Sequence, residues 1–126
     1  MPKVSVVMHP RFLKEIKRMT KEGKAMKELI KNLPTIIAEN LSVPGTKGEL
    51  TPQEVEVEVR TIGPLDITNG KELMINVVAN KYPERLENLD HRRFCIRNRV
   101  LELAPTSVVM KSYVWVHLSD ASYDEF

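Results

Sequence analysis

The amino-terminal stretch MPKVSVVM holds the residue with the most distinctive chemistry, a proline directly after the initiator methionine. Removal of Met1 would leave Pro2 as a secondary amine, and a terminal amine titrates at roughly pH 8, close enough to neutrality to act as a base. Burial among apolar neighbours would lower that pKa, because it disfavours the ammonium form. The alternative is structural: proline is tolerated at the first residue of a strand.

Proton transfer beside a carbonyl also needs a hydrogen-bond donor that stabilises the oxygen on which charge develops. Side chains of the right type are Arg11, Lys47, Arg60, Tyr113 and His117. Structural alternatives stand beside them, with Arg11 in the first turn of a helix and His117 and Trp115 in a subunit interface. Glu54, Glu56 and Glu58 have no His or Cys near them, so we expect no metal site there.

The strands that must position these residues can be predicted from hydrophobic periodicity. Residues 4–8 and 73–79 are short apolar runs, and 53–61 (QEVEVEVRT) alternates valine with charged side chains. A fourth strand is predicted over 107–118, with Tyr113, Trp115 and His117 on one face and valines on the other.

Helical spacing predicts a short helix from residue 11 and a main helix over 24–41, with Gly23 between them. A further helix is predicted from Pro83 to about Leu103. The order β-α-β-β-α-β indicates one α+β domain over 1–126, whose halves are about 1–62 and 70–120. Two βαβ units would form a four-stranded sheet with both helices on one face.

The other face of this sheet would carry Tyr113 and Trp115, and its edge strands would be free. Such a face usually has a partner, so we expect a homo-oligomer.

The bulk properties exclude several classes. The net charge is +2, from 19 basic and 17 acidic residues, so we expect neither nucleic acid nor a membrane as partner, although basic residues can still cluster on one face. No apolar run approaches the length of a membrane span, and no signal peptide is apparent. The single Cys95 fits a reducing compartment, and we predict a cytoplasmic protein.

The stretches MPKVSVV, HPRF, TPQEVEVEV and YVWVHLSD, together with the order of elements, resemble the tautomerase superfamily. Members include 4-oxalocrotonate tautomerase, 5-carboxymethyl-2-hydroxymuconate isomerase and macrophage migration inhibitory factor. The resemblance implies two βαβ units, assembly as a trimer, loss of the initiator methionine, and a catalytic amino-terminal proline in a site between subunits.

Carried over residue by residue, the resemblance makes Pro2 the base, and Trp115 and His117 the aromatic and polar residues of the last strand. The implied activity is keto-enol tautomerisation or isomerisation of a small carbonyl acid without a cofactor. The basic residue that many members carry before the second strand is missing, because Leu50-Thr51-Pro52 stands there and Lys47 is displaced by a few residues.

A non-catalytic α+β module remains the alternative, either ferredoxin-like or a tautomerase-like oligomer that has lost its chemistry. The tautomerase-like fold needs the two strands of each half to be parallel neighbours, whereas the ferredoxin-like fold interleaves the halves.

Overall fold

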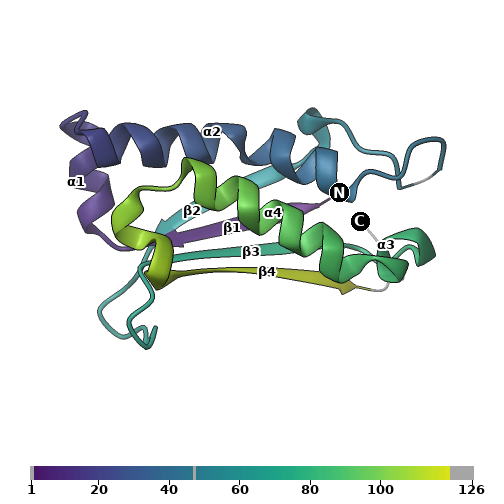
Figure 1. Ribbon diagram of the computed structural model, residues 1–126. Coiled ribbons are helices and arrows are strands. Elements are labelled where there is room, and N and C mark those ends of the chain that lie inside the picture. The colour runs from purple at the N-terminus through teal and green to yellow at the C-terminus, as the bar shows by residue number, and fades with distance from the viewer. Residues whose placement is uncertain (1, 47, 120–126) are drawn as a thin grey trace, which may run out of the picture.

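A computed structural model describes residues 2–46 and 48–119, which form a four-stranded mixed sheet under a layer of helices (Figure 1). The strand order is β2-β1-β3-β4. β1 pairs with β2 in parallel and β3 with β4 in parallel, while β1 and β3 are antiparallel. The strands are β1 (Lys3–Met8), β2 (Glu56–Thr61), β3 (Leu73–Asn80) and β4 (Ser112–Ser119). Each half therefore contributes a parallel pair, which confirms the predicted α+β class and excludes the interleaved ferredoxin-like order.

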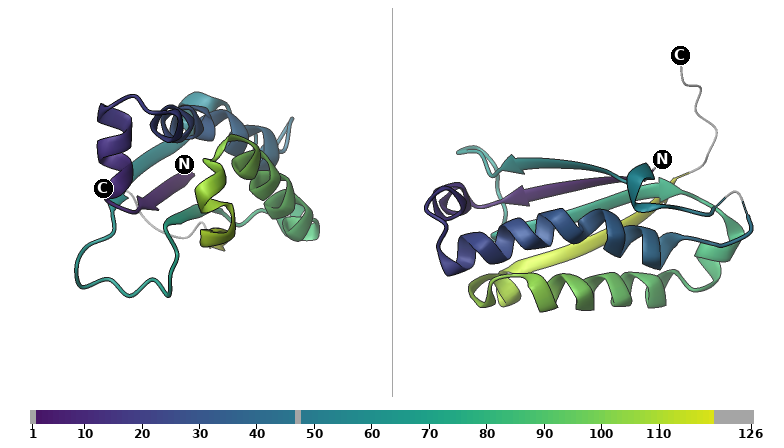
Figure 2. Two further views of the ribbon diagram at one scale, coloured as in Figure 1. Left: turned by 60° about the vertical axis from the view of Figure 1, so that its left-hand side comes forward. Right: turned by 90° about the horizontal axis from the view of Figure 1, so that it is seen from above.

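The two long helices lie on one face of the sheet, as the view from above shows (Figure 2). They pack side by side along the strands, and the core lies between them and the sheet. Strand residues of even number in β1 and of odd number in β3, such as Val6 and Ile75, are fully buried there. The helices are α1 (Arg11–Lys17), α2 (Lys21–Leu41), α3 (Pro83–Glu87) and α4 (Leu89–Leu103).

Two strands begin later than the sequence predicts, because each is preceded by a turn of 3-10 helix. These turns are η1 (Pro52–Glu54) and η2 (Thr106–Lys111). Pro52 has no N–H to donate to a neighbouring strand. In η1 the Thr51 N–H donates a hydrogen bond to the Glu54 carboxylate at 3.1 Å. The valine face of β2 is also less buried than expected, since β2 is an edge strand and Val59 is 43% exposed.

Two predictions about where helices begin and end were wrong, one in each half of the chain. Gly23 does not separate α1 from α2 but lies in the first turn of α2, where a side chain would overlap the carbonyl of Glu15. The chain reverses instead at Met19, whose φ of 55° is in the left-handed region. The predicted single helix from Pro83 is two helices, because the backbone leaves the helical conformation at Asn88.

The sheet has two distinct ends. The Pro2 end holds the start of β1, the end of α2, the end of β3 and α3 (Figure 1). The distal end holds the end of β1, α1, the loop 62–72 and η2. None of the helices in the described ranges is long and apolar enough to cross a membrane. Among the same residues, no three His, Cys, Asp or Glu side chains gather into a potential metal site.

Candidate functional site

Pro2 is buried at the start of β1, where its carbonyl accepts a hydrogen bond from the Glu56 N–H of β2 at 3.0 Å. It lines a cavity of about 90 Å³. The other lining residues come from the loop before β2, the end of β3 and α3, and they are Glu49, Leu50, Glu54, Asn80, Tyr82 and Arg85. The candidate base thus lies in a pocket built by three separate segments of the chain.

Arg85 forms one wall of this cavity and is only 2% exposed. Its Nε donates to the carbonyl of Leu41 at 2.8 Å, Nη1 to that of Asn80 at 2.9 Å and Nη2 to that of Gly48 at 3.0 Å. One side chain therefore joins the last turn of α2, the following loop and the end of β3, satisfying carbonyls that would otherwise be left without partners.

The charge of Arg85 is not neutralised by an acid. Within the described ranges no carboxylate forms an ion pair with it, and the nearest aromatic group is the Tyr82 ring, whose centroid is 4.9 Å from the guanidinium carbon. Burial lowers the pKa of Arg85, and the nearby charge of Arg92 acts in the same direction, although a guanidinium stays protonated at neutral pH. Three of its five N–H groups are accounted for, so a buried positive charge with spare donors borders the Pro2 cavity.

The rim of the cavity is acidic. Glu49 and Glu54 are exposed there, and the Glu54 carboxylate is held by the N–H and the hydroxyl of Thr51 at 3.1 and 3.0 Å. At about 90 Å³ the cavity is also smaller than the 300 Å³ or more of a typical small-molecule site. A single copy of the chain therefore offers less room at Pro2 than a typical small-molecule site does.

The aromatic and polar residues predicted on the last strand lie on the open face of the sheet. Trp115 is 63% exposed, and Tyr113 and His117 are exposed on the same face. His117 pairs with Val78, which in turn pairs with Lys3, so it is level with the start of β1 but two strands, roughly 10 Å, away. Within one copy the structure does not bring these residues into the Pro2 cavity.

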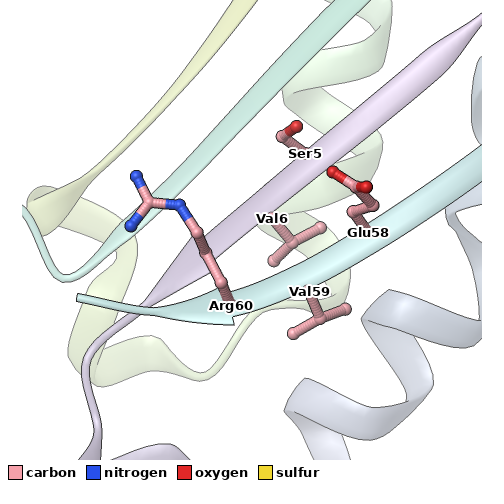
Figure 3. Close-up of a pocket in the computed structure, with 5 residues that line it drawn as sticks. All are labelled: Ser5, Val6, Glu58, Val59 and Arg60. Atoms are coloured by element: carbon pink, nitrogen blue, oxygen red, sulfur yellow. The ribbon is translucent and has the colours of Figure 1, made fainter. Parts of the chain in front are cut away.

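Arg60 also lies away from Pro2. It is beside Val7, about five residues or roughly 16 Å further along the strands, and its guanidinium is paired with Asp66 at 3.3 Å. Figure 3 shows Arg60 and Glu58 on the open side of the sheet, where they line a second cavity of about 250 Å³. The Glu58 carboxylate is paired with Lys3 at 3.2 Å, so both charges of this cavity are satisfied internally.

Arg11 begins α1 at the distal end, the position that its structural alternative predicted. It forms ion pairs with Glu72 and Glu22, each at 3.0 Å, and donates to the Ser107 hydroxyl at 3.2 Å. Although its burial works in the opposite direction, these carboxylates raise the pKa of Arg11. Lys47, the remaining predicted donor, lies outside the described residues.

Sequence reasoning missed Arg85 and Tyr82. A signal for Arg85 was present, because it lies four residues before Leu89 and therefore on the same apolar stripe of the predicted helix. A charged residue on that stripe predicts either burial with partners or a path to solvent. Arg93 met the same criterion, and the structure leaves it partly exposed.

Comparison with known proteins gives matches only among solved structures, since no protein-family model and no curated protein matches the sequence. A macrophage migration inhibitory factor-like protein from Entamoeba histolytica aligns with a TM-score of 0.59 and 12% identity over 99% of this chain and 94% of its own. A 5-carboxymethyl-2-hydroxymuconate delta-isomerase aligns with a TM-score of 0.59 and 10% identity over 100% and 87%. A fused 4-OT, described as a symmetric trimer, aligns with a TM-score of 0.55 and 11% identity over 98% and 90%. The resemblance to the tautomerase superfamily is thus confirmed at the level of the fold.

Proposed function

We propose that this protein is a keto-enol tautomerase or isomerase of a small carbonyl acid, with Pro2 as the general base. One observation carries the proposal above all: Pro2 shares its cavity with the buried guanidinium of Arg85, which forms no ion pair with a carboxylate of the described residues. The fold, common to the structures named above, adds support.

In this mechanism the neutral amine of Pro2 removes a proton from a carbon next to the substrate carbonyl. The electron pair of the broken C–H bond moves toward the carbonyl oxygen, and the proton is returned at a different atom. The positive charge of Arg85 contributes in two ways: it favours the neutral form of the nearby amine, and it stabilises negative charge on the substrate. Neither step requires a cofactor.

The proposal makes two demands on the mature protein. Met1 must be removed, because only then does Pro2 carry an amine. A neighbouring copy must also complete the small cavity, and the exposed Trp115 and His117 are the residues we assign to that role, in a trimer. His117 would donate a hydrogen bond to the substrate oxygen, and Trp115 would form an apolar wall.

The charges around the cavity bear on the substrate. Arg85 favours one carboxylate or enolate inside, whereas Glu49 and Glu54 at the rim disfavour a second negative charge. We therefore expect a monoacid in preference to a diacid.

The test combines intact mass with an assay of phenylenolpyruvate ketonisation. We expect the expressed protein to lack Met1, and Pro2→Ala to lower kcat/KM by about 100-fold or more, the usual contribution of a positioned base. Pro10→Ala is the matched control, because Pro10 is exposed at the distal end and should leave the rate unchanged. A retained methionine, or equal rates for wild type and Pro2→Ala, would contradict the proposal.

A non-catalytic oligomeric module is the second candidate. It is favoured by the fact that Arg11 and Arg60, two of the predicted substrate-binding cations, are neutralised by acids of their own chain. On this alternative, Pro2→Ala changes no rate, while a trimer persists in sedimentation measurements.

A further inference from the structure

Large apolar side chains stand in solvent at the distal end of the molecule. Leu65 is 93% exposed and Ile67 is 90% exposed in the loop 62–72, Met110 is 88% exposed in η2, and Met19 is 67% exposed after α1. Figure 1 and the right-hand view of Figure 2 place these segments at the same end, remote from the start of β1. Such a concentration of exposed apolar groups on one end typically marks an interaction surface.

The loop 62–72 is built so that its two apolar side chains project. Asp66, between them, accepts a hydrogen bond from the Gly63 N–H at 2.7 Å and is paired with Arg60 at 3.3 Å. The bond from Gly63, reinforced by Arg60, lowers the pKa of Asp66 and keeps it charged. The carboxylate thus turns back toward β2, while Leu65 and Ile67 on either side of it are exposed to solvent.

Met19 shows the same feature in a different way. The Met19 N–H bonds to the Ile16 carbonyl at 3.2 Å and the Thr20 N–H to that of Glu15 at 3.2 Å, the pattern of a Schellman cap. The residue in the left-handed conformation of this cap is usually glycine, yet here it is a methionine with a φ of 55°. Because Met19 is mostly exposed, packing within the described part of the chain does not account for a long apolar side chain at this position.

The surroundings of these apolar groups are positively charged. Lys14, Lys17, Arg18 and Lys21 are exposed, and none of them forms an ion pair with any described residue. The neighbouring acids are already engaged within the fold, Glu22 and Glu72 by Arg11, and Glu15 by the Thr20 hydroxyl at 2.6 Å. At the distal end these four cations therefore have no ion-pair partner among the described residues, whereas the acids near them are already bonded within the fold.

We infer that the distal end docks on an anionic lipid bilayer, with Leu65, Ile67 and Met19 entering the interface and the lysines contacting lipid phosphates or carboxylates. A bilayer offers both an apolar phase and negative charge within a few ångströms. Nucleic acid offers phosphates but no apolar phase for aliphatic side chains. A second copy docked end to end would bring like charges together.

This inference departs from the expectation of no membrane partner, which rested on the small net charge of the whole chain. Residues 11–21 contain five basic residues and one acidic residue, whereas residues 49–58 contain four acidic and no basic ones. The small net charge of the whole chain is therefore compatible with a local excess of positive charge at the distal end. Because Pro2 lies at the opposite end, docking would leave its cavity facing away from the lipid.

Co-sedimentation of the full protein with vesicles tests the role of the apolar groups. We expect binding to phosphatidylcholine vesicles containing about 30% phosphatidylserine and little binding to pure phosphatidylcholine. Leu65→Ser combined with Ile67→Ser should weaken vesicle binding by about tenfold or more. Leu86→Ser combined with Phe94→Ser is the matched control, since these residues are 44% and 51% exposed on the helix layer, and should change binding less than about twofold.

A second pair of variants, one test and one control, measures the role of the charged side chains. Lys14→Gln combined with Lys17→Gln should weaken binding by about tenfold, and this loss should shrink as salt is raised. Lys31→Gln combined with Arg97→Gln removes two exposed charges elsewhere and should change binding less than about twofold.

Three outcomes would overturn the inference. The first is no binding to anionic vesicles, and the second is equal binding to neutral ones. The third is a change of oligomer mass in the Leu65→Ser, Ile67→Ser variant by sedimentation velocity, which would assign the surface to contact between copies. If the first outcome is accompanied by binding to duplex DNA, and this binding is unchanged in the Leu65→Ser, Ile67→Ser variant, the exposed cations would be assigned to nucleic-acid binding.

Discussion

Two arginines tie the helices to the sheet, one at each end, and they do so in opposite ways. At the distal end Arg11 meets two carboxylates, those of Glu22 and Glu72, at 3.0 Å each. At the Pro2 end Arg85 meets only carbonyls, those of Leu41, Asn80 and Gly48, at 2.8 to 3.0 Å. The side chain of Arg11 is 34% exposed, whereas Arg85 is 2% exposed.

The two arginines therefore differ in how strongly their positive charge can act on a ligand. The carboxylates around Arg11 cancel its charge locally, so little field is left to act on a ligand. Carbonyl dipoles satisfy the hydrogen-bonding needs of Arg85 but leave its unit charge in place, in a poorly solvated setting where it is weakly screened. That is why Arg85, and not Arg11 or Arg60, is the cation that we assign to the Pro2 site.

The largest expected effect comes from removing each arginine in turn. Arg85→Met should lower the free energy of unfolding by about 3–5 kcal/mol, because three carbonyls lose their donor and at least two of these bonds are buried. Arg11→Met should lower it by about 1–2 kcal/mol, because its partners are partly solvated. Urea denaturation of both variants measures the difference.

Arg85→Lys refines this comparison, because lysine keeps the positive charge but lacks the planar set of N–H donors that a guanidinium has. It should recover about 1–2 kcal/mol of the loss seen in Arg85→Met. Equal losses for Arg85→Met and Arg11→Met would show that the carbonyl contacts stabilise no more than the ion pairs do.

The second prediction compares a glycine at each end. A Cβ at Gly23 would overlap the backbone of Glu15, which cannot move without separating α1 from α2, so Gly23→Ala should destabilise the fold by about 2–3 kcal/mol. A Cβ at Gly48 would approach the Tyr82 ring at 3.2 Å, and a side chain can shift, so Gly48→Ala should cost about 1 kcal/mol or less. Thermal unfolding of both variants checks the order, and a larger loss for Gly48→Ala would reverse it.

How far the sequence predicts this molecule depends on the range of the interactions involved. Alternating valines and helical spacing are local, and they were enough for the four strands, the long helices and their order. The role of Gly23 was misjudged because the need for glycine comes from Glu15 on another helix.

Arg85 was missed for a similar reason. Its partners lie 5, 37 and 44 residues away in the chain, and carbonyl acceptors leave no trace in residue type. The placement of Pro2 in a cavity was anticipated through family resemblance, whereas no spacing rule connects Pro2 with Arg85 or Tyr82.

The third prediction concerns pH and applies only to the distal end. Burial disfavours the charged form of Glu72, but its hydrogen bonds to Arg11 and Lys111 outweigh this and lower its pKa below the ordinary value of 4.5. A lowered pKa in the folded state stabilises the protein above pH 4.5, and that stabilisation is lost as the pH falls through the folded-state pKa. Glu72→Gln should therefore cost about 1–2 kcal/mol at pH 7 and progressively less below pH 4.5.

Melting temperatures of wild type and Glu72→Gln across this pH range provide the measurement. Arg85 has no carboxylate partner in the described ranges, so the penalty of Arg85→Met should stay constant over the same range. A pH-independent gap between wild type and Glu72→Gln would mean that Glu72 acts through packing and not through its charge.

The smallest expected effect is a gain in stability. Met19→Gly should raise the free energy of unfolding by about 0.5 kcal/mol, because glycine adopts the left-handed conformation of the α1 cap without the steric penalty that methionine has at a φ of 55°. Calorimetric unfolding measures the gain, and Asn69→Gly, at a φ of 52° in the loop 62–72, should gain less because asparagine tolerates this region. If Met19→Gly is more stable yet binds anionic vesicles less well than wild type, then the methionine serves docking at the expense of stability. A loss of stability would instead show that Met19 packs within the fold, and the distal end would then lose one of its three docking groups.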